Sequence, residues 1–313
     1  MKQENVTADR KPGHFKTYWK IIKKLMEFLG FVIKPNTAKL YDAIGDDITG
    51  LGNKDYRNLD RPLWLNEGFW KEANTYPKEC EALATLVGDS AKLSSKDEVL
   101  DLGFGFGDQD IFWVKNYNVK KITGINISPL EVRVAQKRIE MKGLAERITV
   151  MVGTATQIPF PDNSFDKVIA MESAMHFNTR EEFFKEAFRV LKPAGKLVTT
   201  DMIPLPGSIQ RGFWKKLRLR SMSVSGKNMY DRNKYIDKLD SLNFVKTTKH
   251  SIRNYVFPGM AKYRSHRLME NKEKEEVIVE LSMEEIEKCE GVQLWEQAYG
   301  INDYVLFTAE KPM

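Results

Sequence analysis

One apolar segment, residues 98–102, predicts a buried strand that runs directly into a loop with three alternating glycines. These are Gly103, Gly105 and Gly107, and a helix is predicted to begin near Asp108. Glycine is needed where a backbone turns sharply and approaches a ligand without an intervening Cβ. The spacing differs from the Gly-x-Gly-x-x-Gly loop of dinucleotide-binding domains, and the Lys-Ser/Thr pair of a phosphate-binding P-loop does not follow. Acidic residues after Gly107 would also repel a phosphate, so the loop predicts a different ligand.

Strand and helix signals alternate between residues 96 and 204. Five apolar segments predict strands, and helical spacing of apolar residues predicts helices between most of them. The predicted strands are Glu98–Leu102, Lys121–Ile127, Ile148–Val152, Asp166–Met171 and Lys196–Asp201. Short strands joined by helices pair in parallel through right-handed crossovers. The sequence therefore predicts an α/β fold with a doubly wound, mostly parallel, seven-stranded Rossmann-like sheet.

The other elements complete this sheet and its helical layers. The predicted helices are Leu130–Lys142, Glu181–Leu191, Asp231–Leu242 and Met260–Cys289, a turn is predicted at Lys192–Gly195, and the last two strands are Val245–His250 and Asp303–Ala309. We expect four regions: a basic amphipathic helical extension or lid (1–60), the Rossmann-like core (61–203), a cap and helix (204–244), and the C-terminal part that completes the sheet (245–313). A cap inserted after the fifth strand lies at the carboxyl edge, where open α/β sheets bind ligands.

The positive charge is concentrated in two segments. The chain has a formal net charge of +6, and its first 34 residues hold eight Lys/Arg against three Asp/Glu. The nearly neutral remainder argues against a nucleic-acid partner. The predicted basic helix Tyr18–Ile33 and the cap segment Arg211–Arg220 allow two interpretations. In the first, the two segments pack on the domain and their lysines and arginines are solvated. In the second, the two segments make peripheral contact with an anionic membrane surface.

Cysteine content and hydropathy indicate the compartment. Two cysteines, Cys80 and Cys289, are too few and too far apart for a disulfide framework or a zinc site, so we expect a reducing compartment and no metal. The apolar stretch Phe28–Ile33 is far shorter than the roughly 20 residues of a membrane-spanning helix, and no signal-peptide cleavage pattern follows it. We predict a cytoplasmic protein, peripheral on a membrane in one interpretation, with a homodimer as one assembly to test.

The pattern Asp-x-Gly-x-Gly-x-Gly resembles the cofactor loop of class I S-adenosylmethionine-dependent methyltransferases, and the resemblance extends through residues 63–206. It implies S-adenosylmethionine as cofactor. The cofactor residues that it implies are Asp101, Gly103, Gly105, Gly107, Gln109, Asn126, Ile127, Thr154, Ala155, Thr156 and Glu172. Asn126 stands where the family has an acidic residue on the ribose hydroxyls, and Thr154 replaces the usual Asp beside the adenine. An amide lacks the charge that strengthens bonds to hydroxyl groups.

Two further segments are most similar to natural-product and sugar O-methyltransferases of the macrolide type. They are Met171–Phe177 and Phe183–Leu191. A hydroxyl acceptor needs a base because its pKa lies far above neutrality. The resemblance implies His176 as this base, with Asp201 at the end of the neighbouring strand to orient it, although a capping or packing role for His176 stays open. Sterol, tocopherol and sarcosine methyltransferases are also similar, so O-, C- and N-methylation all remain candidates.

Two other function classes share this topology. An NAD-dependent oxidoreductase is disfavoured by the glycine spacing and by Asn126 at the ribose position. A non-catalytic binder of adenosyl ligands is the third interpretation, because both Asn126 and Thr154 depart from the family pattern. The sequence therefore favours a methyltransferase that acts on a small molecule.

Overall fold

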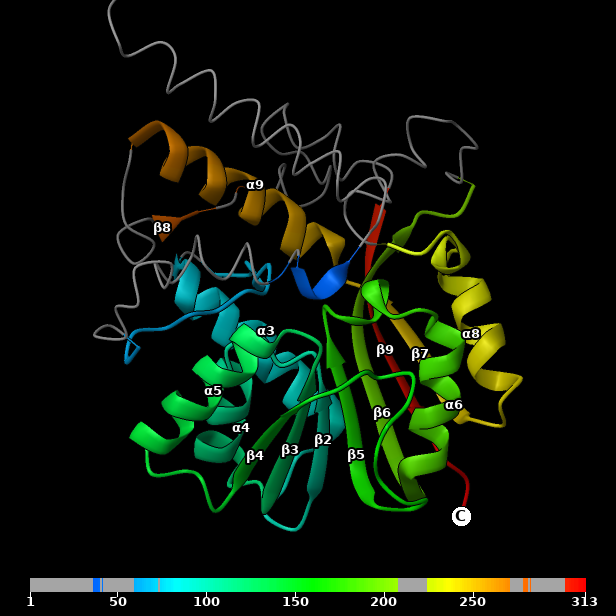
Figure 1. The fold of residues 1–313 in the computed structure, drawn as a ribbon. Coiled ribbons are helices and arrows are strands. Elements are labelled where there is room, and N and C mark those ends of the chain that lie inside the picture. Colours follow the sequence, from blue (N-terminus) through cyan, green and yellow to red (C-terminus); the bar gives the residue numbers. More distant parts are fainter. Residues whose placement is uncertain are drawn as a thin grey trace, which may run out of the picture.

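The computed structural model describes residues 36–39, 41, 59–72, 74–207, 224–270, 278–280, 282 and 302–313. A seven-stranded sheet occupies its centre (Figure 1). The strands are β2 (Glu98–Leu102), β3 (Lys121–Asn126), β4 (Ile148–Val152), β5 (Phe165–Met171), β6 (Leu191–Pro204), β7 (Val245–Ser251) and β9 (Asn302–Glu310). Their spatial order is β4-β3-β2-β5-β6-β9-β7, with β9 antiparallel to both neighbours and the other pairs parallel. The predicted fold class, a doubly wound and mostly parallel sheet, is confirmed.

Strand β6 differs most from its prediction, because it begins at Leu191 instead of Lys196. The segment expected to form a turn is part of the strand, with a register irregularity opposite Phe165 and Lys167. Backbone hydrogen bonds hold it: Ala194 N–H donates to the Lys311 carbonyl at 3.0 Å, and Lys311 N–H donates to the Gly195 carbonyl at 2.9 Å.

Strand β6 also extends beyond β5 at its other end. Pairing with β5 stops at Met171 and Thr200, whereas pairing with β9 continues to Pro204 and Asn302. The overhanging β6–β9 pair therefore rises above the edge of the parallel part of the sheet.

The helices are α3 (Tyr76–Ala91), α4 (Asp108–Tyr117), α5 (Pro129–Met141), α6 (Arg180–Val190), α8 (Arg232–Asp240) and α9 (Arg253–Glu270). Local chemistry starts α5 and α6: the Ser128 hydroxyl accepts from Glu131 N–H at 3.1 Å, and the Thr179 hydroxyl accepts from Glu182 N–H at 3.4 Å. The prediction of one helix over Met260–Cys289 was wrong. Helix α9 begins seven residues earlier and is followed by the short strand β8 (Ile278–Val279), which pairs with β1 (Asn74–Thr75).

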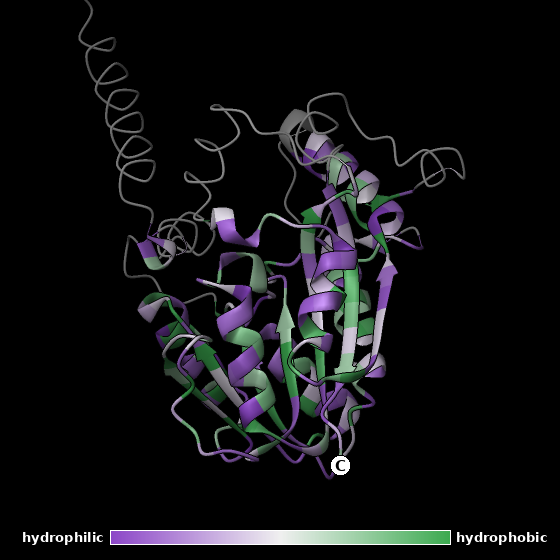
Figure 2. Ribbon diagram, turned by 90° about the vertical axis from the view of Figure 1, so that its right-hand side faces the viewer, coloured by the Kyte–Doolittle hydropathy of each residue, from purple (hydrophilic) through white to green (hydrophobic). Residues whose placement is uncertain are grey.

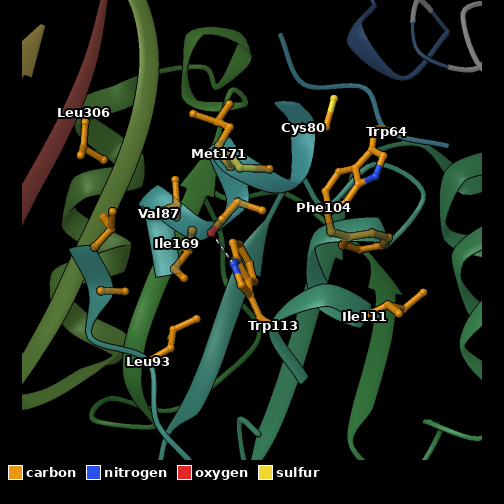
Figure 3. Packing of buried hydrophobic residues seen from close by; sticks show 14 of the residues in the cluster. Trp64, Cys80, Val87, Leu93, Phe104, Ile111, Trp113, Ile169, Met171 and Leu306 are labelled. Atoms are coloured by element: carbon orange, nitrogen blue, oxygen red, sulfur yellow. Dashed lines mark hydrogen bonds between the residues drawn. The ribbon is translucent and has the colours of Figure 1, made fainter. Parts of the chain in front are cut away.

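Two hydrophobic clusters cover the two faces of the sheet. Neighbouring residues of β2 point to opposite faces: Val99 joins a cluster with α3 and α4, and Leu100 joins a cluster with α6 and α8. Figure 3 shows the first cluster, in which Trp113 Nε1 donates to the Ala84 carbonyl at 2.8 Å and so satisfies its one polar atom. Apolar colour is concentrated in the central strands in Figure 2, and the surrounding helices alternate between polar and apolar residues.

Some predictions fall on residues outside the described ranges. They include the basic helix Tyr18–Ile33, the cap segment Arg211–Arg220 and Cys289. The four-region division stays a prediction. Within the described ranges, no helix is both long and apolar enough to cross a membrane.

Candidate functional site

A cavity of about 740 Å³ opens at the carboxyl ends of the parallel strands, where α9 passes across the end of the sheet (Figure 1). Strands, loops and helices that are distant in sequence contribute to its wall. Of the predicted site residues, those that line it are Gly103, Gly105, Gln109, Asn126, Ile127, Thr154, Ala155, Thr156, Glu172 and His176. The other three, Asp101, Gly107 and Asp201, lie outside the lining.

The glycine loop leaves no room for side chains at the cavity wall. Gly103 has φ +88°, and a Cβ there would lie 2.4 Å from the Cβ of Ser173. Gly105 has φ +56°, and a Cβ there would lie 3.2 Å from Leu65. Gly103 therefore requires glycine for both conformation and space, Gly105 requires it chiefly for conformation, and both line the cavity.

Asp101 and Gly107 support the loop from behind. The Asp101 carboxylate is buried and accepts from Gln109 Nε2 at 2.8 Å, so its contact with the cavity passes through Gln109. Burial raises the pKa of Asp101 to about 6. Burial, together with the charge of Asp101, raises the pKa of neighbouring Asp110. Gly107 starts α4 and packs against Ala135.

An acidic residue, Glu131, lies beside Asn126. Asn126 Nδ2 donates to Glu131 Oε2 at 2.6 Å, and Asn126 Oδ1 accepts from Ser128 N–H at 3.3 Å. Glu131 is buried and lines the cavity from the first turn of α5. The sequence analysis missed Glu131, although its place three residues after the capping Ser128 marks it as a first-turn acid.

The segment expected at the adenine is held by helix α6. Ile158 N–H donates to Glu186 at 2.7 Å, and Arg189 donates to the carbonyls of Ile158 and Phe160 at 2.9 and 2.8 Å. Arg189 also pairs with Glu186, with one N–O distance of 2.8 Å. These contacts of Glu186 and Arg189 fix the loop that carries Thr154 and its neighbours.

Glu172 lies at the end of β5 with the left-handed φ of 54°, which non-glycine residues rarely adopt. Its Oε1 accepts from Glu67 N–H at 2.8 Å and from the Tyr304 hydroxyl. Burial and the nearby charge of Glu67 raise the pKa of Glu172 to about 8. Glu67, which the sequence analysis did not select, lines the same part of the cavity.

His176 ends the short 3₁₀ helix η3 (Ala174–His176), and its ring meets Tyr41 edge-on at 5.3 Å between centroids.

The structure corrects the role expected for Asp201. Both Asp201 oxygens accept from the Arg180 guanidinium, at 2.7 and 2.9 Å, and burial raises the pKa of Asp201 while Arg180 opposes that rise. A planar guanidinium matches both oxygens of a carboxylate, which explains why Arg180 takes this position.

Arg180 connects Asp201 to the turn that carries His176. Arg180 N–H donates to Asn228 Oδ1 at 3.0 Å, and Asn228 Nδ2 donates to the carbonyls of Met175 and Phe177 at 3.1 and 2.7 Å. Asn228 belongs to the short 3₁₀ helix η4 (Gly226–Asn228), and both Arg180 and Asn228 line the cavity. The Arg180 guanidinium, which pairs with Asp201, also donates to the Asn228 carbonyl, so the ion pair braces the residues on either side of His176.

The lining brings together several kinds of polar group. Among the described ranges, no group of three or more His, Cys, Asp or Glu side chains is arranged to hold a metal ion. The wall combines backbone at the glycine loop, an amide and carboxylate at Asn126 and Glu131, and one imidazole at His176. Such a wall can bind hydroxyl groups and accept a proton.

Comparison with known proteins gives consistent results. Residues 100–199 match the family model of the methyltransferase domain. The chain is 36% identical over 232 residues to erythromycin 3''-O-methyltransferase from Saccharopolyspora erythraea, which covers 71% of this chain and 75% of that protein. It is 31% identical over 167 residues to 27-O-demethylrifamycin SV methyltransferase from Amycolatopsis mediterranei, covering 51% and 61%.

A solved structure supports the same fold. The crystal structure of the cyclase SpnF aligns with a TM-score of 0.66 at 21% identity and covers 89% of this chain and 97% of that one. The glycine loop, the domain match and the 36% identical relative agree. The chain belongs to the class I S-adenosylmethionine-dependent methyltransferases that act on small molecules.

Proposed function

We propose that this methyltransferase acts on a hydroxyl oxygen of a sugar, polyketide or lipid-like acceptor, with His176 as the base. The observation that carries the proposal is that His176 and the glycine loop line one cavity of about 740 Å³. A cavity of this size admits a nucleoside cofactor together with part of an acceptor. The names of two relatives, erythromycin 3''-O-methyltransferase and 27-O-demethylrifamycin SV methyltransferase, support an oxygen acceptor.

The lining residues fit S-adenosylmethionine. Gly103 and Gly105 line the cavity without side chains, so a ligand can approach the backbone of the loop closely. We assign the ribose hydroxyls to Asn126 and Glu131 together, since Glu131 supplies the carboxylate that Asn126 lacks. Thr154, Ala155 and Thr156 would hold the adenine edge. When bound, the cofactor supplies a methyl carbon already activated by its sulfonium.

His176 would accept the proton of the acceptor hydroxyl, a contribution of about 10²- to 10⁴-fold in rate for a positioned base. The hydrogen bonds from Asn228 to Met175 and Phe177 would keep the His176 imidazole in place as the proton moves. Asp201, enclosed with Arg180, would act as a positioning residue for this turn.

The test is transfer of an isotopically labelled methyl group, combined with calorimetric binding of S-adenosylhomocysteine. We expect His176→Ala to keep the affinity within about twofold and to lower transfer by about 10²- to 10⁴-fold, with partial recovery as pH rises and hydroxide replaces the base. His250→Ala, on the exposed face of β7, is the matched control. Unchanged turnover in His176→Ala would reject the base assignment, and a label found on carbon or nitrogen would reject the hydroxyl acceptor.

Two finer features are also proposed. The basic segments Tyr18–Ile33 and Arg211–Arg220 would give weak attachment to anionic lipid, supported by their charge and apolar content. Absence of co-sedimentation with anionic liposomes would remove this idea. A homodimer is the second, and light scattering at several concentrations tests it.

A further inference from the structure

Methionine side chains gather in one half of the cavity wall. Five of the chain's 13 methionines line the cavity, and they come from different parts of the fold. They are Met171 in β5, Met175 in η3, Met202 in β6, Met229 directly after η4 and Met260 in α9, here called the methionine wall. Methionine is unbranched and has a polarizable thioether, so its side chain adapts to irregular apolar shapes. The wall therefore favours an apolar ligand whose shape it can follow.

The methionine wall and the residues assigned to the nucleoside lie on opposite sides of the glycine loop. The loop follows β2, which lies between β3 and β5 in the sheet. Asn126 ends β3 and Thr154 comes after β4, on one side of β2, whereas β5 and β6 lie on the other. Helix α9, which carries Met260, passes across the end of the sheet (Figure 1). With the first side assigned to the nucleoside, the methionine wall is left for the acceptor.

Buried polar side chains hold the backbone that carries three of these methionines. Arg180 Nη2 donates to the Met202 carbonyl at 3.3 Å, and Asn228 Nδ2 donates to the Met175 carbonyl at 3.1 Å. Met229 directly follows Asn228, whose carbonyl accepts from Arg180. The main chain is thus fixed at these positions, while the unbranched side chains can still change rotamer.

The same polar side chains offer little to a ligand. Asn228 and Arg180 are each 1% exposed. The Asn228 amide is used by Arg180 N–H and by two backbone carbonyls, and the Arg180 guanidinium is used by Asp201. Asn178 and Arg267 also line the cavity, but both are exposed and so stay hydrated. A ligand hydroxyl that loses its water beside the methionine wall finds few partners there, which disfavours it.

The His176 imidazole is the exception. It lines the cavity one residue after Met175, and in the proposed function it accepts the proton of one hydroxyl. A ligand with one hydroxyl in an alkyl framework matches both the imidazole and the methionines. A sugar ring carries further hydroxyls around the reacting one, and these would face thioethers and methyl groups.

We propose that the acceptor is an aliphatic alcohol and that the methionine wall binds the alkyl surface around its reacting hydroxyl. This narrows the acceptors of the proposed function from sugars, polyketides and lipid-like molecules to those with alkyl surroundings. That the bound alcohol receives the methyl group rests on the function proposed above. The preference of the wall for alkyl over polyhydroxylated ligands does not, because it follows from the side chains alone.

The test uses the full chain with ¹³C-labelled methionine methyl groups. NMR follows each methyl signal, and single Met→Leu variants assign the signals of the methionine wall. The ligands are n-butanol, n-hexanol and n-octanol, compared with methyl β-D-glucopyranoside, on the protein alone and on protein saturated with S-adenosylhomocysteine. Met141, which is 56% exposed on α5 and lies outside the cavity lining, reports adsorption elsewhere.

We expect the alcohols to shift the signals of the methionine wall and to leave Met141 unchanged. Affinity should rise about two- to fourfold for each added CH₂. The glucopyranoside should shift none of these signals at the same concentrations. Met202→Gln, which keeps the length and adds an amide, should weaken n-octanol by about fivefold or more, and Met202→Leu should stay within about threefold of wild type. Met141→Gln is the matched control and should bind as wild type does.

The proposal is overturned if wild type binds the glucopyranoside as tightly as n-octanol, if n-octanol leaves the signals of the methionine wall unchanged, or if Met202→Gln keeps the wild-type affinity. Should Met202→Gln not fold, as judged by circular dichroism, Met229→Gln takes its place, since Met229 is also partly exposed and lines the cavity. Failure of the proposed function looks different. If wild type does not bind S-adenosylhomocysteine, that function fails, and the alcohol titration on the protein alone still decides the preference of the wall.

Discussion

Asp201 and Arg180 form a two-point ion pair that is sealed from solvent, with N–O distances of 2.7 and 2.9 Å and side-chain exposures of 0% and 1%. Removing one partner leaves the other as an uncompensated buried charge. We expect Asp201→Asn to lower the free energy of unfolding by about 3–5 kcal/mol. Denaturant unfolding measures this change, and Glu182→Gln, which breaks the exposed pair with Lys185, should cost less than about 1 kcal/mol.

The same substitution tests the bracing of His176. Asp201→Asn should reduce methyl transfer while the folded fraction still binds S-adenosylhomocysteine, because Asp201 lies outside the cavity lining. An Asp201→Asn protein with wild-type stability and turnover would show that the ion pair has no such role.

The hydrogen bond from Ile158 N–H to Glu186 predicts an effect on cofactor affinity rather than on the rate of methyl transfer. Glu186→Gln weakens the acceptor for Ile158 N–H, now at 2.7 Å, and breaks the ion pair with Arg189. Because Glu186 and Arg189 are partly exposed, we expect a loss of only about three- to tenfold in affinity for S-adenosylhomocysteine. Lys185→Ala on the same helix is the control. A change in turnover at saturating cofactor, with affinity intact, contradicts this prediction.

Gly103→Ala combines a backbone penalty with a collision. Its φ is +88°, and the added Cβ would lie 2.4 Å from the Cβ of Ser173. Gly143→Ala has a comparable φ of +66° with nothing within 4 Å, so it measures the backbone penalty alone, about 1 kcal/mol. We expect Gly103→Ala to cost clearly more in thermal unfolding and to abolish nucleoside binding. Equal costs at the two positions would disprove the collision.

The buried carboxyl groups of Asp101 and Asp110 predict a pH-dependent stability. Burial raises the pKa of Asp101 to about 6, so the folded state binds its proton more tightly than the unfolded state does. The associated stability is complete below the unfolded pKa of about 3.8 and is lost as pH rises through about 6. Unfolding free energies measured between pH 5 and pH 8 should therefore decline.

Asp110→Asn should flatten this decline. The amide removes the charge beside Asp101 and can donate to a carboxylate oxygen of Asp101 that has no partner among the described residues. We expect a gain of about 1–3 kcal/mol at pH 8 and little change at pH 5. Asp240→Asn, on the exposed face of α8, should leave the pH profile unchanged. If the unfolding free energy of Asp110→Asn declined more steeply with pH than that of the wild type, the Asp101–Asp110 pair would not be the cause of the pH dependence.

Sequence patterns predicted the parallel part of the sheet and the glycine loop because both depend on local chemistry. The central strands are buried on both faces and so contain apolar residues in succession, as at Val99 and Leu100, and the positive φ angles of Gly103 and Gly105 favour glycine. Helix α9 was less predictable. It passes through Pro258 and Gly259, and the glycine is required because a Cβ there would lie 2.1 Å from Trp70.

The polar partners of the site were missed for a different reason. Arg180 and Asn228 are 48 residues apart in the chain, and Arg138 Nε, which helps to fix the start of the core, donates to the Leu59 carbonyl 79 residues away. Nothing in the local pattern of charged residues distinguishes a buried arginine from a solvated one. Only the folded arrangement shows that Asp201 faces Arg180 and that Glu131 stands beside Asn126.

The overhang of β6 and β9 determines the order in which the molecule can assemble. Pro204 and Asn302 pair at its tip and both line the cavity, yet they come together only after closure of a loop of about a hundred residues. Strand β2, which leads into the glycine loop, pairs at Val99 with Ile122 and Lys167, 23 and 68 residues away, and contacts more distant in sequence slow folding. A refolding chain should therefore regain the glycine-loop side of the cavity first and the wall at Pro204 and Asn302 last.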